Sequence, residues 1–310
     1  MNTLSNINAF AKNEPNKFIE VSEEKYHSEI RSLAEKIVNN ENYKIVLLAG
    51  PSGSGKTTTA HILKENIIRL GHGAEVVSLD NFYLEAEKMP RLKNGQPDFE
   101  TVYSLDIPEI HKCFSQIISV GKTDMPIFNF AERKREETMH LVDVSEGGIV
   151  IVEGLHALNP VLYDKLPANN LLKIYISVND FVSHNGKKLL SSRKMRLARR
   201  LSRDYIYRNT SPTETLKLWT SVIEGEEKYL YCFKDTADLL IKTFHMYEPC
   251  VFRDIIYGLL KDLPKSAENY GYAIEMRDAL LKFEPICLDN VPQNSLLREF
   301  ILGGKFENSK

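Results

Sequence analysis

Residues 44–58 of the chain read KIVLLAGPSGSGKTT, an apolar run followed by a glycine-rich turn and the start of a helical pattern. The run at 44–49 is apolar without alternation, which is typical of a parallel strand that is covered on both faces. Residues 50–57 fit the pattern G-x-x-x-x-G-K-[ST], and a strand before it and a helix after it are the context that this motif requires. A Gly/Ser-rich turn that matches by chance is the alternative, and both flanking elements argue against it. The sequence therefore predicts a phosphate-binding loop between a buried strand and a helix.

The residue types of this loop suit a nucleoside triphosphate. Glycines let successive backbone N–H groups converge on phosphate oxygens, and the helix N-terminus adds partial positive charge. Lys56 is expected to reach the β- and γ-phosphates, and the Thr57 hydroxyl to ligate Mg²⁺. The predicted ATP-binding residues of the loop are Gly50, Ser52, Gly53, Ser54, Gly55, Lys56, Thr57 and Thr58.

Outward from the loop, strand-like runs alternate with helical patterns. The further strand candidates are residues 74–79, 148–152, 171–178 and 237–241. A capping-box pattern predicts a helix that begins at Ile107, and a second one predicts a helix that begins at Pro212. Strands separated by helices imply βαβ units, so the predicted fold class is α/β, with a mostly parallel sheet flanked by helices.

Composition excludes several classes of protein. The 310 residues carry 40 basic and 42 acidic side chains, and a net charge of -2 argues against a general nucleic-acid binder. The four cysteines form no C-x-x-C pair, which favours reduced thiols in the cytosol. Neither a signal peptide nor a membrane-length apolar run is visible. We therefore expect a cytoplasmic protein with no membrane partner and no stable nucleic-acid partner.

Two carboxylates follow predicted strands. Glu153 ends the strand at 148–152, and Asp80 comes just after the strand at 74–79. Both fall at the carboxyl edge of the sheet, where α/β proteins bind ligands, so Glu153 could hold Mg²⁺ and Asp80 could accept a proton from an attacking hydroxyl. The alternatives without a catalytic role are that Glu153 is an exposed acid at the end of a strand and that Asp80 caps a helix or turn. No N-K-x-D or L-S-G-G-Q motif occurs, which favours a small-molecule kinase over a GTPase or an ABC-type ATPase.

The stretch 187–208 holds nine basic residues and one acid. Four of its arginines have the i, i+3, i+4, i+7 spacing of one helix face: Arg196, Arg199, Arg200 and Arg203. Converging like charges repel unless an anion joins them, so we expect these arginines to close over a triphosphate. A solvated basic face or a nucleic-acid patch is the alternative, although no stacking aromatic residues are interleaved.

Together these segments resemble the uridine kinase and phosphoribulokinase family of P-loop kinases. The resemblance rests on GPSGSGKTT at 50–58, SLDNFY at 78–83, VEG at 152–154 and RLARRLSRDYIYR at 196–208. It covers residues 43–242. The stretch VPQNSLLREFI at 291–301 resembles a longer bacterial branch of uridine kinase-like proteins. Members of that branch often carry an N-terminal region similar to part of threonyl-tRNA synthetase, and this sequence does not show that region.

The resemblance implies a role for each matching residue. Asp80 would be the catalytic base, Lys56 would bind the β/γ-phosphates, and Thr57 and Glu153 would lie at Mg²⁺. Arg200, Arg203 and Arg208 would close over ATP. The implied acceptor-site residues are Asp80, Tyr83, Glu100, Phe128, Arg133, Arg135 and Arg203.

The base pocket departs from the family pattern. Pyrimidine nucleoside kinases read Y-D-F and then H-S-R, whereas this chain has FNFAERKR at 128–135. Phe128 lacks the tyrosine hydroxyl, and Arg133 replaces the histidine that meets the base, while Arg135 matches. A pocket selects a polar base because a wrong ligand leaves buried hydrogen-bonding groups of the pocket without partners. Both exchanges alter such groups, so they weaken the assignment of uridine or cytidine as the substrate.

The sequence thus predicts an Mg-ATP-dependent kinase that phosphorylates the 5'-hydroxyl of a nucleoside. Open alternatives are a kinase for another hydroxyl compound, such as a sugar phosphate or a pantothenate-like acid, and a nucleotide-binding regulatory or RNA-associated protein. The predicted domains are residues 1–42, where a loose leader precedes a helix that begins at Ser22, a kinase core at 43–245 with a lid at about 187–210, and a helical extension at 246–310. Assembly into a homo-oligomer stays open.

Overall fold

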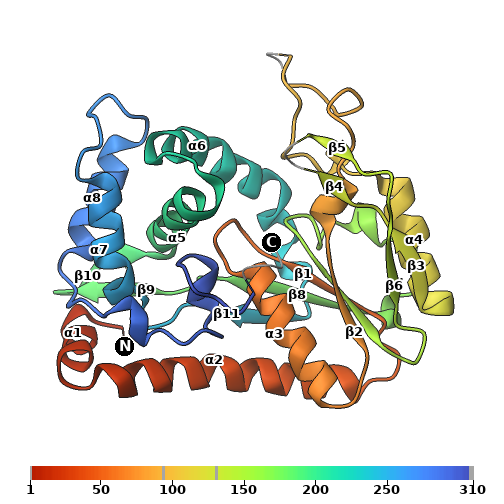
Figure 1. Cartoon of the computed structure of the whole chain (residues 1–310), viewed down its shortest axis with the longest axis horizontal. Helices are drawn as coiled ribbons and strands as arrows, with labels where there is room; N and C mark the ends of the chain where they lie inside the picture. The colour runs from red at the N-terminus through yellow and green to blue at the C-terminus, as the bar shows by residue number, and fades with distance from the viewer. Residues whose placement is uncertain (1, 93–94, 130–131, 307–310) are drawn as a thin grey trace.

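The computed structural model describes residues 2–92, 95–129 and 132–306 (Figure 1). Its centre is a five-stranded parallel sheet with the order β11-β8-β1-β7-β2. The strands are β1 (Ile45–Ala49), β2 (Ala74–Ser78), β7 (Ile149–Glu153), β8 (Leu171–Ser177) and β11 (Leu239–Lys242). Each coincides with a run that the sequence marks as a strand, and the predicted α/β fold class is confirmed.

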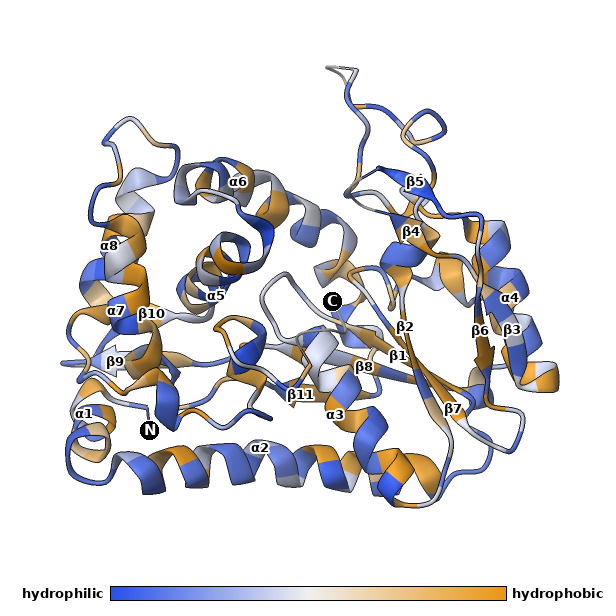
Figure 2. Cartoon of the chain, in the orientation of Figure 1, coloured by the Kyte–Doolittle hydropathy of each residue, from blue (hydrophilic) through white to orange (hydrophobic). Residues whose placement is uncertain are grey.

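The two faces of the sheet are covered by different helices. Val46 and Leu48 pack with the apolar faces of α2 (Pro15–Val38) and α3 (Lys56–Arg69). Ile45, Leu47 and Ala49 pack instead with α4 (Ile107–Val120). Figure 2 shows hydrophobic residues concentrated in β1 and β7, whereas α2 carries them on part of its surface. Burial on both faces explains why these strands lack the alternation of a half-exposed strand.

Two helices begin where their capping sequences predict. The Asp106 side chain accepts the N–H of Glu109 at the start of α4, and Ser211 and Glu214 cap each other's N–H groups at the start of α6 (Pro212–Tyr229). No helix in the described part of the chain combines the length and the apolar composition needed to cross a membrane.

Six short strands form three antiparallel pairs that the sequence does not mark. They are β3 (Lys122–Met125) with β6 (His140–Asp143), β4 (Phe128–Asn129) with β5 (Lys134–Arg135), and β9 (Phe181–His184) with β10 (Lys187–Ser191). They are two to five residues long, and four of them carry charged side chains, so they are too short and too polar to show an apolar periodicity in the sequence.

The N-terminal residues are packed helices, so the expectation of a loose leader before Ser22 is wrong. Leu4 and Ile7 of α1 (Leu4–Asn13) are buried, and α2 begins at Pro15, seven residues earlier than Ser22. Their short apolar stripes are covered because both helices pack against the body of the protein. The Tyr26 hydroxyl of α2 lies 2.7 Å from the Thr59 hydroxyl of α3, which links the N-terminal helix to the helix that follows the phosphate-binding loop.

After β11 the described residues form α7 (Glu248–Leu260), α8 (Tyr270–Leu280) and short 3₁₀ turns, with no further strand in the described part. These helices lie beside α5 (Ser192–Arg208) in Figure 1. Arg199 of α5 and Glu248 of α7 form a fully buried ion pair, in which Arg199 Nε lies 3.1 Å from Glu248 Oε2. The boundary between a kinase core and an extension stays a prediction, because one apolar core spans both.

Candidate active site

The phosphate-binding loop connects β1 to α3 at the carboxyl edge of the sheet. Gly53 and Gly55 have φ values of +73° and +88°, which glycine adopts at little cost. A Cβ on Gly50 would lie 2.5 Å from the carbonyl oxygen of Ile176 in β8. The loop therefore needs glycine both for its turns and for its close approach to the neighbouring strand.

Side chains from α5 and α6 hold the first half of this loop. The N–H of Ser52 donates to Glu226 Oε1 at 2.8 Å, and Arg196 Nε donates to the carbonyl of Ser52 at 2.8 Å. Arg200 Nη1 donates to the Ser52 hydroxyl, also at 2.8 Å. Glu226 is 1% exposed and pairs with Arg196 as well. Sequence reasoning missed Glu226, since it belongs to no motif and lies 174 residues from Ser52.

We predict that Glu226→Ala weakens ATP binding by about tenfold or more. A hydrogen bond to a charged group contributes about 1.5–3 kcal/mol, and its loss frees the loop backbone at Ser52. Glu227→Ala is the matched control, since the Glu227 side chain is 57% exposed and pairs with Arg193 at the surface. Calorimetric titration with ATP measures the effect, and equal affinities of the two variants would contradict it; thermal melts check that both are folded.

The predicted convergence of four arginines is wrong for two of them. Arg196 is buried against Ser52 and Glu226. Arg199 is fully buried, where it contacts Glu248 and donates to the carbonyl oxygens of Gly53 and Thr243. Both charges are therefore paired within the protein. This happens because α5 packs against the phosphate-binding loop, which Arg196 and Arg199 both contact, and also against α7, which supplies Glu248. Of the predicted lid, residues 187–191 form β10 and the first turns of α5 lie in the core.

Arg200 and Arg203, together with Arg208, surround one carboxylate. Asp204 lies 3.2 Å from Arg200 Nε, 2.8 Å from Arg203 Nη2 and 3.5 Å from Arg208 Nη1. Arg203, burial and Arg200 lower the pKa of Arg208 to about 10, and Asp204 opposes them. Three guanidinium groups around a single carboxylate leave positive charge in excess, which is the electrostatic setting of an anion site. The predicted grouping of Arg200, Arg203 and Arg208 thus has a geometric basis.

Asp80, Lys56 and Glu153 form the acidic and basic centre of the site. The Asp80 residue is exposed to solvent, but neighbouring protein atoms displace part of the hydration of its carboxylate and so raise its pKa. Lys56, Arg208 and Arg203 act to lower the same pKa. Burial raises the pKa of Glu153 to about 7; Lys56 opposes this shift and Asp80 adds to it. Lys56 Nζ donates to the carbonyl of Pro51 at 3.3 Å. The three predicted residues therefore come together, as their positions after β1, β2 and β7 require.

The residues predicted to hold Mg²⁺ fit that ion. Glu153 is 6% exposed, and a second carboxylate, Asp80, raises its pKa, so a divalent cation would offset the cost of charging it. Thr57 is the second residue of α3, next to Lys56. Within the described residues no group of three or more His, Cys, Asp or Glu side chains could hold a metal. Mg²⁺ usually keeps waters and binds phosphates besides one or two protein ligands, which agrees with Thr57 and Glu153 alone.

Of the predicted acceptor residues, Tyr83 and Phe128 pack together, and Glu100 follows Phe99, which Tyr83 also contacts. The centroid of the Tyr83 ring lies 5.8 Å from that of Phe128 and 6.0 Å from that of Phe99. The Tyr83 hydroxyl donates to the carbonyl of Phe99. Burial raises the pKa of Glu100 to about 7, against the lowering effect of Arg200. Glu226, Asp98 and Asp80 raise the pKa of Glu100 further. The Glu100 carboxylate lies against α6, because a Cβ on Gly225 would be 2.8 Å from Glu100 Oε2.

Arg135 and Arg133, both predicted to contact the substrate, lie in different surroundings. Arg135 donates to the carbonyls of Tyr83 and Phe82 and to Asp106 Oδ2 at 3.0 Å, so it supports the turn that bears Asp80. Arg133 is exposed, with a φ of +55°. Phe130 and Ala131 of the same predicted base pocket lie outside the described residues.

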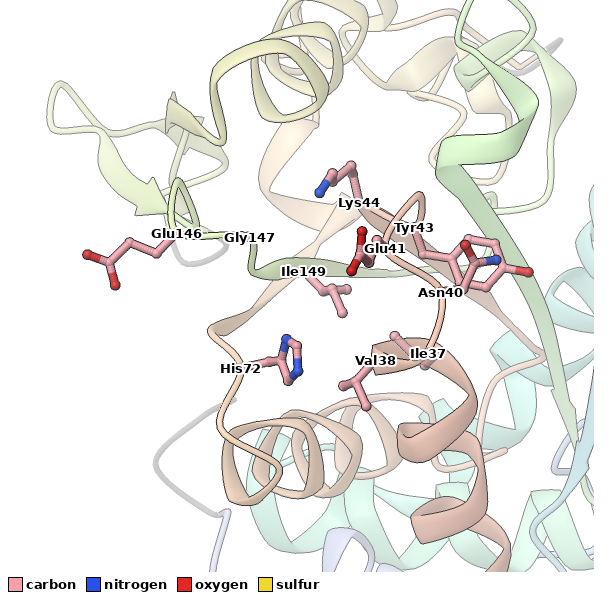
Figure 3. Close-up of a pocket in the computed structure, with 10 residues that line it drawn as sticks. All are labelled: Ile37, Val38, Asn40, Glu41, Tyr43, Lys44, His72, Glu146, Gly147 and Ile149. Carbon is pink, nitrogen blue, oxygen red and sulfur yellow. The ribbon is translucent and has the colours of Figure 1, made fainter.

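A cavity of ≈ 320 Å³ lies elsewhere, at the amino ends of the strands (Figure 3). Its lining includes Val38 at the end of α2, His72 before β2, and Ile149 at the start of β7. None of the predicted site residues lines it. The residues of the predicted site lie instead at the opposite, carboxyl edge of the sheet.

The sequence matches known proteins in the region that holds this site. The model of the phosphoribulokinase / uridine kinase family matches residues 45–248. A uridine kinase of Schizosaccharomyces pombe is 30% identical over 184 residues, which make up 58% of this chain and 36% of that protein. A uridine kinase of Lactobacillus helveticus is 25% identical over 200 residues, 64% of this chain and 85% of that protein.

The two yeast relatives are longer than the matched region. The match spans 36% of the length of the uridine kinases of Schizosaccharomyces pombe and Saccharomyces cerevisiae. Among solved structures, a possible uridine kinase from Bacillus stearothermophilus superposes with a TM-score of 0.47 and 15% identity, covering 69% of this chain and 98% of that one. On the family match, which covers the loop, both carboxylates and the arginine cluster, the chain belongs to the phosphoribulokinase and uridine kinase family of P-loop kinases.

Proposed function

We propose that the protein transfers the γ-phosphoryl group of Mg-ATP to the 5'-hydroxyl of a nucleoside. The observation that carries the proposal is the placement of Asp80. Lys56, Arg208 and Arg203 act to lower its pKa, and Asp80 in turn adds to the raised pKa of Tyr83 and of Glu100, two predicted acceptor-site residues, after burial. A carboxylate close to both the cations of the phosphate site and the predicted acceptor residues can take the proton of an attacking hydroxyl during phosphoryl transfer.

The residues divide the work of transfer between them. Loop amides and Lys56 hold the phosphates, and Thr57 and Glu153 would hold Mg²⁺, which neutralises phosphate charge when bound. The acceptor oxygen forms a bond to the γ-phosphorus as the bond to the β,γ-bridging oxygen breaks, and ADP leaves. Asp80 takes the hydroxyl proton as this happens. Arg203 and Arg208 offset the charge on the transferring group.

Two features favour a neutral acceptor over a sugar phosphate or another anion. Lys134 Nζ lies 2.7 Å from Glu132 Oε2, and Arg135 gives its donors to Asp106 and backbone carbonyls. Arg133, Lys134 and Arg135 would suit an anionic acceptor, but two of these three cations are already paired within the protein. Glu100 suits ribose hydroxyls, which donate to a carboxylate. Similar proteins that carry the name uridine kinase support a nucleoside acceptor.

The burial of two arginines of α5 weighs against the alternative of an RNA-associated protein. Arg196 and Arg199 are at most 4% exposed, so α5 does not present its arginines as one continuous basic surface. A polyanion would meet fewer cations there than the sequence alone implies. The excess charge is instead local, around Asp204, which suits a triphosphate.

The role of Glu100 predicts a pH dependence of acceptor binding. Its pKa of about 7 means that it becomes charged as the pH rises through 7, and a charged acceptor of hydrogen bonds binds hydroxyls more strongly. We therefore expect the KM for the acceptor to fall several-fold between about pH 6 and pH 8. Glu100→Gln should have a higher KM without this step. A step of equal size in Glu100→Gln would contradict the assignment.

A coupled assay of ADP formation over all common nucleosides and several phosphorylated sugars tests the proposed function. We expect turnover with at least one nucleoside and none with sugar phosphates. Turnover with phosphorylated acceptors alone would show that the acceptor is anionic. No turnover with any acceptor, together with RNA binding that falls steeply with salt, would overturn the kinase assignment.

A further inference from the structure

Residues 295–306, here called the C-terminal segment, cover the first turns of α3. Glu299 Oε2 accepts the backbone N–H of Thr58 at 3.2 Å. A Cβ on Gly55 would lie 2.6 Å from Leu296 Cδ1, so this leucine packs directly on the loop. Farther along α3, the Phe306 ring stacks on His61 at 5.5 Å, and Lys305 Nζ lies 2.6 Å from Glu65 Oε1. The segment thus follows α3 from the phosphate-binding loop outward.

The contact with Thr58 uses a donor that a nucleotide requires. The first N–H groups of a helix have no partner within the helix, and in this motif they cradle the phosphates. Glu299 is 7% exposed, so its carboxylate is largely shielded from water beside the loop. A carboxylate at this place therefore both occupies a phosphate donor and repels an incoming phosphate.

The same segment is joined to the arginine-bearing helix. Ser202 Oγ donates to the carbonyl of Phe300 at 2.7 Å, and Tyr207 Oη donates to the carbonyl of Ile301 at 2.9 Å. Both donors belong to α5, between and beside the arginines that surround Asp204. The segment therefore bridges the loop that binds the phosphates and the helix that supplies their positive charge.

We propose that the C-terminal segment is an autoinhibitory element, in which Glu299 occupies the phosphate site and ATP must displace it. Displacement changes the contacts of the segment with α5, so nucleotide occupancy is coupled to the helix that carries Arg200, Arg203 and Arg208. The proposal rests on the proposed function only in that the loop binds ATP. It makes no use of the acceptor.

Calorimetric titration with Mg²⁺ and the non-hydrolysable analogue AMP-PNP tests the proposal without an acceptor. Glu299→Gln removes the charge but keeps an oxygen that can accept from Thr58, so the fold is preserved. We expect it to bind AMP-PNP about tenfold more tightly than the wild type, and the exposed Glu268→Gln control to match the wild type. Equal or weaker binding by Glu299→Gln would overturn the proposal, since Glu299 would then be a cap or a nucleotide ligand.

Hydrogen exchange gives an independent readout on the unchanged protein. Saturation with Mg²⁺ and AMP-PNP should speed amide exchange in residues 295–306 several-fold and leave α7 unaffected. Unchanged or slower exchange would overturn the proposal, because the segment would then stay seated on the nucleotide. Failure of wild type and Glu299→Gln to bind any nucleotide would overturn it too, whereas failure of the acceptor screen with normal AMP-PNP binding would affect the proposed function alone.

Discussion

Asp80→Asn is expected to lower kcat by about 10²- to 10⁴-fold while the affinity for ATP stays within a few-fold of the wild type. The asparagine keeps the size of the side chain but cannot accept the proton of the attacking hydroxyl, and general-base help contributes about that factor. ATP affinity should be preserved because we propose that loop amides and Lys56, and not Asp80, hold the phosphates. Steady-state kinetics and calorimetry measure the two quantities separately.

The pH profile adds a second readout for Asp80. Its pKa is raised by the surrounding protein, so the fraction of enzyme with a competent base increases with pH, and kcat should rise toward a plateau. The rise should be absent in Asp80→Asn. Asp262→Asn, which changes an exposed carboxylate, is the matched control. Near-normal turnover of Asp80→Asn would show that Asp80 is not the base.

Arg203→Ala should lower kcat by about 10³-fold with little change in the KM for the acceptor. Arg203 shares Asp204 with Arg200 and Arg208, and it acts on the charge of Asp80. An arginine that offsets charge on a transferring phosphoryl group contributes about 10³- to 10⁵-fold to kcat. Arg203→Lys should restore only part of the rate, because an ammonium group lacks the planar fork of donors.

Arg193→Ala is the control for this variant. Arg193 lies on the same helix, its side chain is 46% exposed, and it pairs with Glu227 at the surface. Its kinetics should equal those of the wild type. A change in Arg203→Ala that is confined to the KM for the acceptor would contradict a role for Arg203 in stabilising the transition state.

Local patterns predicted most of the fold. The apolar runs of β1 and β7 and the caps of α4 and α6 are decided by neighbouring residues, and each element lies where its pattern indicates. The convergence of Lys56, Asp80 and Glu153 also follows, because carboxyl ends of parallel strands share one edge. These features need no information about distant parts of the chain.

Long-range partners could not be predicted in the same way. Helical spacing showed that Arg196, Arg199, Arg200 and Arg203 share one side of α5, but not that Glu226 and Glu248 would neutralise two of them. Those carboxylates lie 30 and 49 residues away, in helices whose packing depends on the whole core. Glu299, 241 residues from Thr58, illustrates the same limit at the phosphate site.

The central claim is tested most directly by identifying both products of a single reaction. The protein is incubated with Mg²⁺, ATP and the nucleoside that gives the highest turnover, and the products are quantified by ³¹P NMR. We predict ADP and a nucleoside 5'-monophosphate in equal amounts, with both lost in Asp80→Asn. ADP with inorganic phosphate alone, or equal product from Asp80→Asn, would contradict a kinase in which Asp80 activates the nucleoside hydroxyl.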